Sequence, residues 1–181
     1  MGGSPRPIAI DLDGSLTVAD TGWLMFRRML LRRPWHLPGA ARSLLKGRAD
    51  LKHHLWRTVP IEVSTLPWRN DLVAWLSARS QEGHALHLVT GAPHPLAELA
   101  AAAQPFPCTG HGSLPGHNLT STRKAAHLVE AFGARGFDYV GNARADLAVW
   151  ALAERAIVCG GDRRLLRRVR AVCARVGPLF P

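Results

Sequence analysis

Short apolar runs recur along the chain, and longer segments with helical periodicity separate them. The clearest runs, each bounded by turn residues, cover residues 8–11, 85–90, 138–142 and 156–160. Continuous apolar runs of this length predict buried strands of a parallel sheet. Between them, apolar residues three or four positions apart predict helices; these span residues 96–103, 121–132 and 146–154. Strands that alternate with helices indicate an α/β sheet built from βαβ units.

Two other segments affect the ends of this sheet. Residues 106–109 also fit a strand, but prolines on both sides disfavour it because proline cannot donate to a sheet ladder. Near the C-terminus an apolar stripe among arginines predicts the last helix. The stripe consists of Leu165, Leu166, Val169, Val172, Cys173 and Val176.

The segment over residues 17–80 departs from the alternation of strands and helices. It has no clear strand, and its apolar residues recur at helical spacing between proline and glycine breakers. We interpret it as a helical cap inserted after the first strand, with a return helix over residues 67–80. The expected organisation is an α/β core formed by residues 1–16 and 81–181, with the cap at residues 17–80.

Length and cysteine content limit the class of protein. A chain of 181 residues can bury one core with a small insertion, but hardly two full domains. Its three cysteines lack paired spacing, which disfavours disulfides or a zinc knuckle and fits a reducing cytosol. No run approaches about 18 apolar residues, and the first strand begins by Ile8, so neither a membrane span nor a signal peptide is expected. We therefore expect a cytoplasmic protein, with peripheral membrane contact as an alternative.

The net charge is unusually high. The chain has 23 Lys and Arg residues against 13 Asp and Glu residues, a formal charge of +10. Such a surplus attracts polyanions: nucleic acid, anionic lipid headgroups or a phosphorylated substrate. We do not expect nucleic acid, because no known nucleic-acid-binding pattern is present. The basic residues of the cap and last helix form either an ordinary solvated face or a surface for a lipid-linked phosphate or an anionic membrane.

Two carboxylates end the first strand. Asp11 and Asp13 are one residue apart, so their side chains can lean into the same crevice while Leu12 enters the core. Carboxylates this close repel one another unless a cation or proton lies between them, and Mg²⁺ is the natural occupant. One carboxylate can attack phosphorus to give an aspartyl-phosphate, and the other can shuttle a proton. The alternative is a strand that runs into a common Asp-Gly turn.

Three other strand exits or helix starts carry compatible chemistry. Thr90 and Gly91 offer a hydroxyl and an approachable N–H group for a phosphoryl oxygen. Asn142 and Asp146 lie one helical turn apart and carry the oxygen ligands that Mg²⁺ prefers. Lys124 supplies a positive charge for a phosphoryl group. Each element is common alone, but ligands of α/β sheets bind at strand exits, so the ordered set indicates a phosphoryl-transfer site.

These elements resemble the four motifs of the haloacid dehalogenase (HAD) superfamily of phosphohydrolases. The matching segments are Asp11-Leu-Asp-Gly-Ser-Leu16, Thr90-Gly91, Lys124 and Gly141-Asn-Ala-Arg-Ala-Asp146. The resemblance implies a HAD-like Rossmannoid core, with three α/β/α layers around a parallel sheet. It also implies a small helical cap of the C1 type, inserted after the first strand.

A narrower resemblance is to the soluble HAD domain that precedes UbiA-type polyprenyltransferase domains in many bacteria. The segments that carry it are Arg33-Pro-Trp35, Leu51-Lys52, Val59-Pro60, Leu128-Val-Glu-Ala-Phe-Gly133, Gly136-Phe-Asp-Tyr-Val-Gly-Asn142 and Ala145-Asp-Leu-Ala-Val-Trp150. This resemblance implies a lipid-linked substrate and contact with a UbiA-type prenyltransferase.

The superfamily resemblance also implies a role for each motif residue. Asp11 would be the nucleophile, Asp13 the acid/base residue, and Lys124 the residue that shields charge. Thr90 would bind the phosphoryl group, together with the backbone at Gly14 and Gly91. The implied Mg²⁺ ligands are Asp11, Asp13 through its backbone carbonyl, Asn142 and Asp146.

The chain departs from the superfamily pattern at two positions. Ser15 replaces the usual Thr and keeps the hydroxyl. Asn142 replaces the usual Asp, which removes one negative charge and is expected to weaken Mg²⁺ binding. The third motif is less sharply defined, because Arg123 precedes Lys124, and Thr120 and Ser121 lie at the same helix start.

The expected function is a Mg²⁺-dependent phosphomonoester hydrolase that acts through an aspartyl-phosphate intermediate. Its substrate would be a polyprenyl-linked phosphate, a phosphosugar or another phosphorylated small molecule. The alternative is a non-catalytic HAD-like interaction module that docks on a prenyltransferase or an anionic membrane, which the Asn142 substitution favours. A small phosphotransferase or mutase is a third variant.

Overall fold

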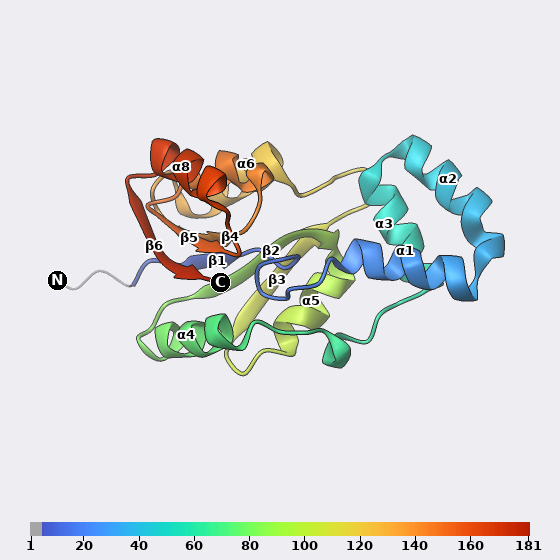
Figure 1. Cartoon of the computed structure of the whole chain (residues 1–181), viewed down its shortest axis with the longest axis horizontal. Helices are drawn as coiled ribbons and strands as arrows, with labels where there is room; N and C mark the ends of the chain where they lie inside the picture. The colour runs from blue at the N-terminus through green and yellow to red at the C-terminus, as the bar shows by residue number, and fades with distance from the viewer. Residues whose placement is uncertain (1–4) are drawn as a thin grey trace.

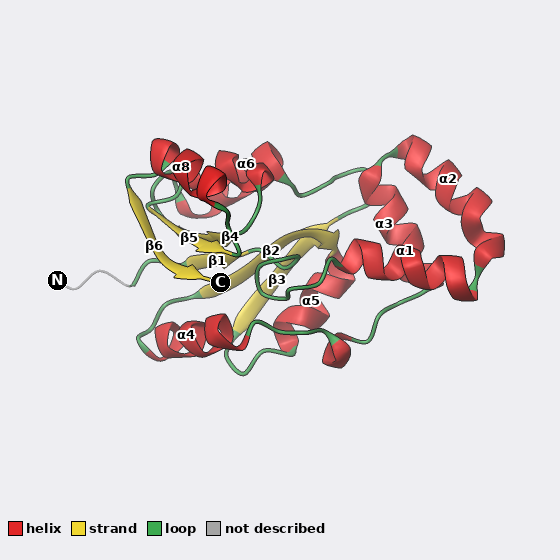
Figure 2. Ribbon diagram, viewed as in Figure 1, coloured by secondary structure: helices red, strands yellow, loops and turns green. Residues whose placement is uncertain are grey.

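A computed structural model describes residues 5–181 of the chain and contains one parallel sheet of six strands (Figure 2). The strands are β1 (Ile8–Ile10), β2 (Leu86–Pro93), β3 (Cys108–Ser113), β4 (Asp138–Gly141), β5 (Arg155–Cys159) and β6 (Arg175–Phe180). Their order is β3-β2-β1-β4-β5-β6, and every pair is parallel. The order reverses between β1 and β4, and open α/β sheets bind ligands beyond the carboxyl ends of strands at such a point.

Helices cover both faces of the sheet (Figure 1). The helices of the core are α4 (Asn70–Gln81), α5 (His94–Ala102), α6 (Ser121–Phe132), α7 (Leu147–Trp150) and α8 (Arg163–Val172). Successive residues of a strand point to opposite faces, so Ile8 and Ile10 pack with α4 and α5, whereas Ala9 packs with α6, α7 and α8. The predicted three-layer α/β/α core is therefore confirmed.

Three helices project beyond the carboxyl end of the sheet (Figure 1). They are α1 (Thr21–Arg32), α2 (Leu37–Lys46) and α3 (Arg48–Thr58), with short 3-10 turns at Pro34–His36 and Val63–Thr65. Asp20 caps α1 by accepting a hydrogen bond from the Trp23 N–H group. The buried side chains of Met25, Met29 and Leu55 join α1 to α3. In residues 5–181, no helix combines the length and apolar character needed to cross a bilayer.

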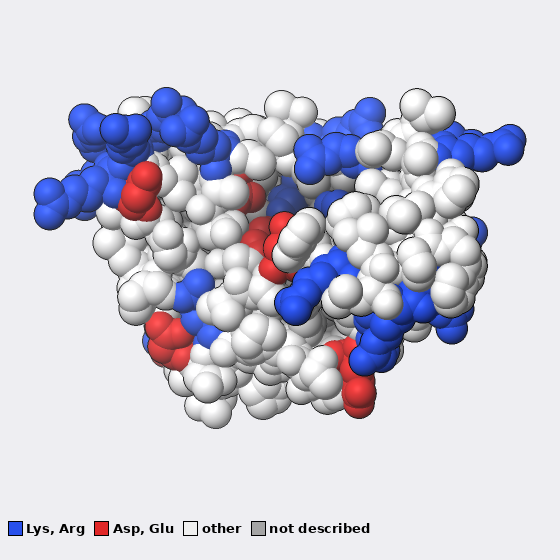
Figure 3. All heavy atoms as spheres, turned by 45° about the vertical axis from the view of Figure 1, so that its right-hand side comes forward, with Lys and Arg blue, Asp and Glu red and all other residues white. Residues whose placement is uncertain are grey.

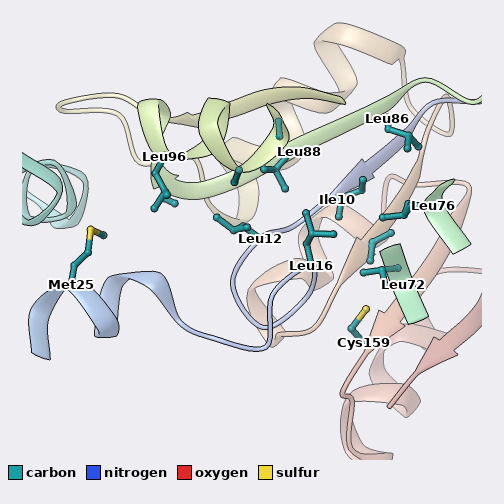
Figure 4. Packing of buried hydrophobic residues seen from close by; sticks show 14 of the residues in the cluster. Ile10, Leu12, Leu16, Met25, Leu72, Leu76, Leu86, Leu88, Leu96 and Cys159 are labelled. Carbon is teal, nitrogen blue, oxygen red and sulfur yellow. The ribbon is translucent and has the colours of Figure 1, made fainter. Parts of the chain in front are cut away.

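The return helix α4 packs as part of the core. Leu72 and Leu76 are fully buried and lie beside Ile10 and Leu16 (Figure 4). We propose that residues 17–80 are one inserted segment in which α1–α3 form the cap proper and α4 contributes a layer of the sheet.

The C-terminal prediction was wrong in part. The last helix ends at Val172, and Val176 belongs to β6 instead of continuing the apolar stripe of α8. Cys173 has an extended backbone, and the residues after it pair with β5 at the edge of the sheet, where Pro178 is tolerated. A helical stripe and an alternating strand coincide over so few residues that the sequence pattern cannot separate them.

Other elements also differ from their predicted extents. Strand β2 was expected to end at Thr90 but continues to Pro93, with a shift in its register against β3 after Val89, so Thr90 and Gly91 lie within the strand. The disfavoured fifth strand exists as β3, shifted to Cys108–Ser113 and therefore clear of Pro107. The helix expected over residues 146–154 is a 3-10 turn at Arg144–Asp146 followed by the single turn of α7.

Candidate active site

The centre of the crevice is an ion pair at the end of β1. Asp11 follows the strand directly, and its N–H group donates to the Val140 carbonyl oxygen at 2.9 Å. The Lys124 side chain is buried, and its Nζ lies 2.6 Å from Asp11 Oδ1. Burial raises the pKa of Asp11 to about 7, and Asp146 and Asp13 act in the same direction, although the Lys124 ammonium lowers it. The adjacent Arg123 is exposed, so the geometry favours Lys124 for the third motif.

A buried tyrosine connects this pair to Asp146. The Tyr139 hydroxyl accepts a hydrogen bond from Lys124 Nζ at 2.9 Å and donates to Asp146 Oδ1 at 2.7 Å. Burial and the nearby Asp146 raise the pKa of Tyr139 well above its usual value, so the hydroxyl keeps its proton. Asp146 Oδ2 accepts the N–H groups of Asn142 and Ala143 at 3.1 and 3.0 Å. Both carboxylate oxygens of Asp146 are thus bonded to protein donors.

Asp13 connects the core to the cap. Its Oδ1 accepts the N–H group of Thr21, the first residue of α1, at 2.8 Å. Burial raises the pKa of Asp13, while the hydrogen bonds from Thr21 oppose that change.

Gly14 allows the loop after Asp13 to approach Asn142 closely. Its φ of +74° favours glycine, and a Cβ atom there would lie 2.0 Å from Asn142 Nδ2. Arg69 holds the same loop, because its guanidinium donates to the carbonyl oxygens of Gly14 and Ser15 at 3.2 and 3.1 Å. The structure therefore brings the first and fourth predicted motifs together.

Thr90 and Gly91 form the wall contributed by β2. The Thr90 side chain is buried, and its hydroxyl accepts the Ala92 N–H group at 3.1 Å. A Cβ atom at Gly91 would lie 2.4 Å from Thr120 Cγ2, so this position of β2 has no room for a side chain. The close approach of Thr120 explains why a glycine follows the hydroxyl here.

Lys52 of α3 extends from the cap to this wall. Its Nζ donates to the Gly91 carbonyl oxygen at 2.7 Å. Burial lowers the pKa of Lys52, whereas Asp13, Asp20 and Asp11 raise it.

Neither Lys52 nor Tyr139 was predicted as a site residue, because Lys52 is one of many basic cap residues and Tyr139 fits a buried strand without further explanation. The only sequence signal for Tyr139 was a hydroxyl in an apolar run, since a buried hydroxyl needs a partner.

The oxygen ligands around the crevice fit a hard cation in part. The carboxylates of Asp11 and Asp13, with the Asn142 amide, bring oxygen ligands to the end of β1. Figure 3 shows acidic side chains gathered in a recess, with Lys and Arg side chains on both sides of it. Across residues 5–181, no cluster of three or more His, Cys, Asp or Glu side chains is placed to hold a metal ion.

Sequence comparison finds a relative but no family. No family model matches the chain. A protein of Sinorhizobium fredii, described as uncharacterized protein y4nM, is 29% identical over 175 residues. The alignment covers 97% of this chain and 34% of that protein, so the chain spans about a third of the length of its curated relative.

Comparison with solved structures defines the fold class. A HAD-family hydrolase from Salmonella enterica serovar Typhi has a TM-score of 0.65 and 12% identity, with 96% of this chain and 68% of that chain covered. A phosphoserine phosphatase solved as a phospho-aspartyl intermediate analogue has a TM-score of 0.61 and 14% identity, with 94% and 93% covered. The chain therefore has the α/β fold of HAD hydrolases.

Proposed function

We propose that the protein is a Mg²⁺-dependent phosphomonoester hydrolase in which Asp11 is the nucleophile. The observation that carries this proposal is the buried pair of Asp11 and Lys124 at the carboxyl end of β1, 2.6 Å apart. The ammonium of Lys124 is shared between Asp11 and Asp146, at 2.6 and 3.9 Å, so an ionised Asp11 is only partly neutralised and can attack an electrophile. The likeness to a phosphoserine phosphatase with a phospho-aspartyl intermediate analogue supports the same chemistry.

The proposed reaction has two steps. A carboxylate oxygen of Asp11 attacks phosphorus, the bond to the leaving oxygen breaks, and Asp13 gives that oxygen a proton. Water then attacks the aspartyl-phosphate, Asp13 takes a proton from it, and phosphate leaves with Asp11 restored. Lys124 neutralises charge that accumulates on the phosphoryl oxygens. The backbone N–H group of Gly91 and the Thr90 hydroxyl would bind the same oxygens.

Asp11, the backbone carbonyl of Asp13 and Asn142 would hold Mg²⁺. The bound ion would supply positive charge to the phosphoryl oxygens. The prediction of Asp146 as a fourth ligand would require it to exchange a protein hydrogen bond for the metal. We propose instead that Asp146 positions Lys124 through Tyr139, because both of its oxygens already have donors.

The basic cap supports an anionic substrate. Lys52 lies at the mouth of the crevice, where it can bind a charged or polar part of the substrate beyond the phosphoryl group. We propose a phosphorylated small molecule, with a polyprenyl-linked phosphate or a phosphosugar as the finer assignment. Association with a UbiA-type prenyltransferase and a cytoplasmic, membrane-peripheral location belong to this finer proposal.

A non-catalytic interaction module is the second candidate. Asn142 favours it, since a neutral amide holds a divalent cation less strongly than a carboxylate at the same position. Such a module would keep the fold and the buried network but would not turn over a phosphoester.

The test compares wild type with Asp11→Asn on an aryl phosphate, with Mg²⁺ or with EDTA. The substitution keeps shape but removes the nucleophile, so activity should fall to background. Asp71→Asn, an exposed aspartate in the first turn of α4, is the matched control and should keep full activity. Substantial activity in Asp11→Asn would rule out the aspartyl-phosphate mechanism. A folded wild type that is inactive on every phosphoester would favour the interaction module.

The Mg²⁺ requirement has its own test. Asn142→Asp restores a carboxylate of nearly the same shape, so the half-saturating Mg²⁺ concentration should fall. The maximal rate need not rise, because the added charge also repels the phosphate dianion. A Mg²⁺ titration that shows no shift, or a shift toward weaker binding, would mean that Asn142 does not contact the metal.

A further inference from the structure

We propose that the outer surface of the cap, formed by α1, α2 and the turn between them, docks on the anionic lipids of a bilayer. The first observation is the exposure of its apolar side chains. Leu45 is 89% exposed, Leu31 72% and Trp35 70%. The other exposed large apolar side chains of these elements are Trp23, Leu30, Leu37 and Leu44. Large exposed apolar side chains concentrated in one segment of the chain indicate a site of interaction.

These side chains are not needed to hold the cap together. On α1, the buried side chains are Met25 and Met29, which face the core cluster, whereas Trp23 and Leu31 point away from it into solvent. Helix α2 buries only Ala40 and leaves its leucines exposed. The fold therefore accounts for the buried side of α1, whereas the apolar side chains of the outer surface stay largely exposed among residues 5–181, although the Trp23 ring lies 5.9 Å from that of Phe26.

The charge of this surface is of one sign. Residues 21–49 contain seven Lys or Arg residues and no Asp or Glu. Most of the seven are exposed, and within residues 5–181 none forms an ion pair with an acidic side chain. The basic residues are Arg27, Arg28, Arg32, Arg33, Arg42, Lys46 and Arg48. Exposed tryptophan and leucine among unpaired arginines are the composition of a helix surface that lies in the headgroup region of a membrane.

A groove next to this surface has room for a lipid headgroup. It has a volume of about 540 Å³ and lies between α1 and the segment that follows α3. Arg27, Arg28 and Arg32 line it together with one acidic side chain, Glu62, so the lining carries a net positive charge. Apolar side chains, which include Leu24 and Leu31, form most of the rest. Arg28 is held in place by a 2.7 Å hydrogen bond to the Pro60 carbonyl oxygen. A phosphate at the arginines would leave the attached chain beside Leu31, so the groove suits an anionic amphiphile.

The arginines of α8 provide a contrast that favours lipid over a polyanion in general. Five arginines of this helix are exposed, and its apolar residues Leu165 and Val169 are buried. This helix has charge without exposed large apolar side chains, whereas the cap has both. A purely electrostatic partner would use either surface, but a bilayer interface gains additional free energy only at the cap.

The experiment measures co-sedimentation of the full chain with vesicles. Phosphatidylcholine vesicles with and without phosphatidylglycerol are compared at low and high salt. The apolar variant combines Leu31→Ser, Trp35→Ser and Leu45→Ser, all at exposed positions, and the charge variant combines Arg27→Gln and Arg32→Gln. The matched control, Arg167→Gln with Arg168→Gln on α8, removes the same charge. Circular dichroism checks that each variant is folded.

Wild type should bind anionic vesicles, with weaker binding at high salt. Near a membrane surface each basic residue contributes about fivefold, so the charge variant should bind roughly 25-fold less. The apolar variant should also lose binding, at unchanged net charge. The α8 control should bind several-fold better than the charge variant. Inorganic phosphate at matched ionic strength should not release the protein, because a free phosphate lacks the apolar part.

Four results would overturn the proposal. Equal recovery on neutral and anionic vesicles, or none on either, would exclude an anionic bilayer. If the charge variant and the α8 control lost vesicle binding equally, the attraction to the vesicle would come from the overall charge of the protein and not from a docking site on the cap. Release by free phosphate would make the groove an anion site. A wild-type dimer that the apolar variant converts to a monomer, without vesicle binding, would assign the surface to a second copy of the chain. None of these outcomes depends on phosphatase activity.

Discussion

On the sheet side of the crevice, Lys124 and Asp146 are buried and bonded through Tyr139. The cap, by contrast, exposes leucines, tryptophans and arginines on its outer surface, and within residues 5–181 the basic side chains of residues 21–49 form no ion pair. The first side can hold reacting groups in fixed positions, because a satisfied buried network permits few alternative geometries. The second has the features of a binding surface. Lys52 and Asp13 lie where the two meet. The comparison indicates that kcat should depend on residues of the sheet side, and that affinity for the substrate should depend on residues of the cap side.

The largest expected effect concerns Asp11 and pH in the presence of EDTA. The pKa of Asp11 is raised from 3.8 to about 7 by burial. Between these two pKa values Asp11 keeps its proton in the folded protein but has lost it in the unfolded chain. The free energy of unfolding should therefore fall as pH rises from about 4 to 7. One pKa unit corresponds to ~1.4 kcal/mol, so the loss should be a few kcal/mol.

Thermal unfolding of wild type and Asp11→Asn between pH 4 and 8 measures this effect. Asp11→Asn should be the more stable protein above pH 7 and should match wild type near pH 4. Asp71→Asn, at an exposed position, should keep the wild-type dependence of stability on pH. Parallel curves for wild type and Asp11→Asn would contradict a raised pKa at Asp11.

The next effect isolates the sheet side. Tyr139→Phe removes the hydroxyl that joins Lys124 to Asp146 but keeps the ring in the core. A hydrogen bond to a charged group contributes about 1.5–3 kcal/mol, so kcat should fall at least about tenfold. KM should change little, because the hydroxyl is buried behind Lys124. Steady-state kinetics on an aryl phosphate measures both constants, and an unchanged kcat would leave Tyr139 as core packing only.

The smallest effect isolates the cap side. Lys52→Met keeps the length of the side chain and removes its charge, so KM for an anionic substrate should rise about tenfold or less, the equivalent of ~1.4 kcal/mol. The value of kcat should stay within a few fold. Lys52→Arg should restore part of the affinity, and Lys46→Met, at an exposed position of α2, is the matched control. A loss confined to kcat would instead make Lys52 part of the chemical step and break the division between the two sides.

The sequence by itself determined the parallel sheet and the order of its motifs. The runs that became β1, β2, β4 and β5 are apolar because both faces of these strands are covered, so they are visible without any contact information. Three predicted site residues lie at the ends of such runs: Asp11, Thr90 and Asn142. Because parallel strands bring their carboxyl ends to one edge of the sheet, the sequence places these residues near one another. The edge strand β6 was missed because it is partly exposed, and its few apolar residues fit a helix equally well.

Only the tertiary structure decided which side chains meet and which remain exposed. Lys52 and Gly91 are 39 residues apart, and the bond between them depends on how the cap folds back over β2. In the same way, the cap sequence alternates apolar and basic residues throughout, yet Met25 is buried and Leu31 is not. Periodicity shows that a helix has an apolar stripe, but the side that is buried, and whether a second apolar surface is left over, depends on the packing of distant segments.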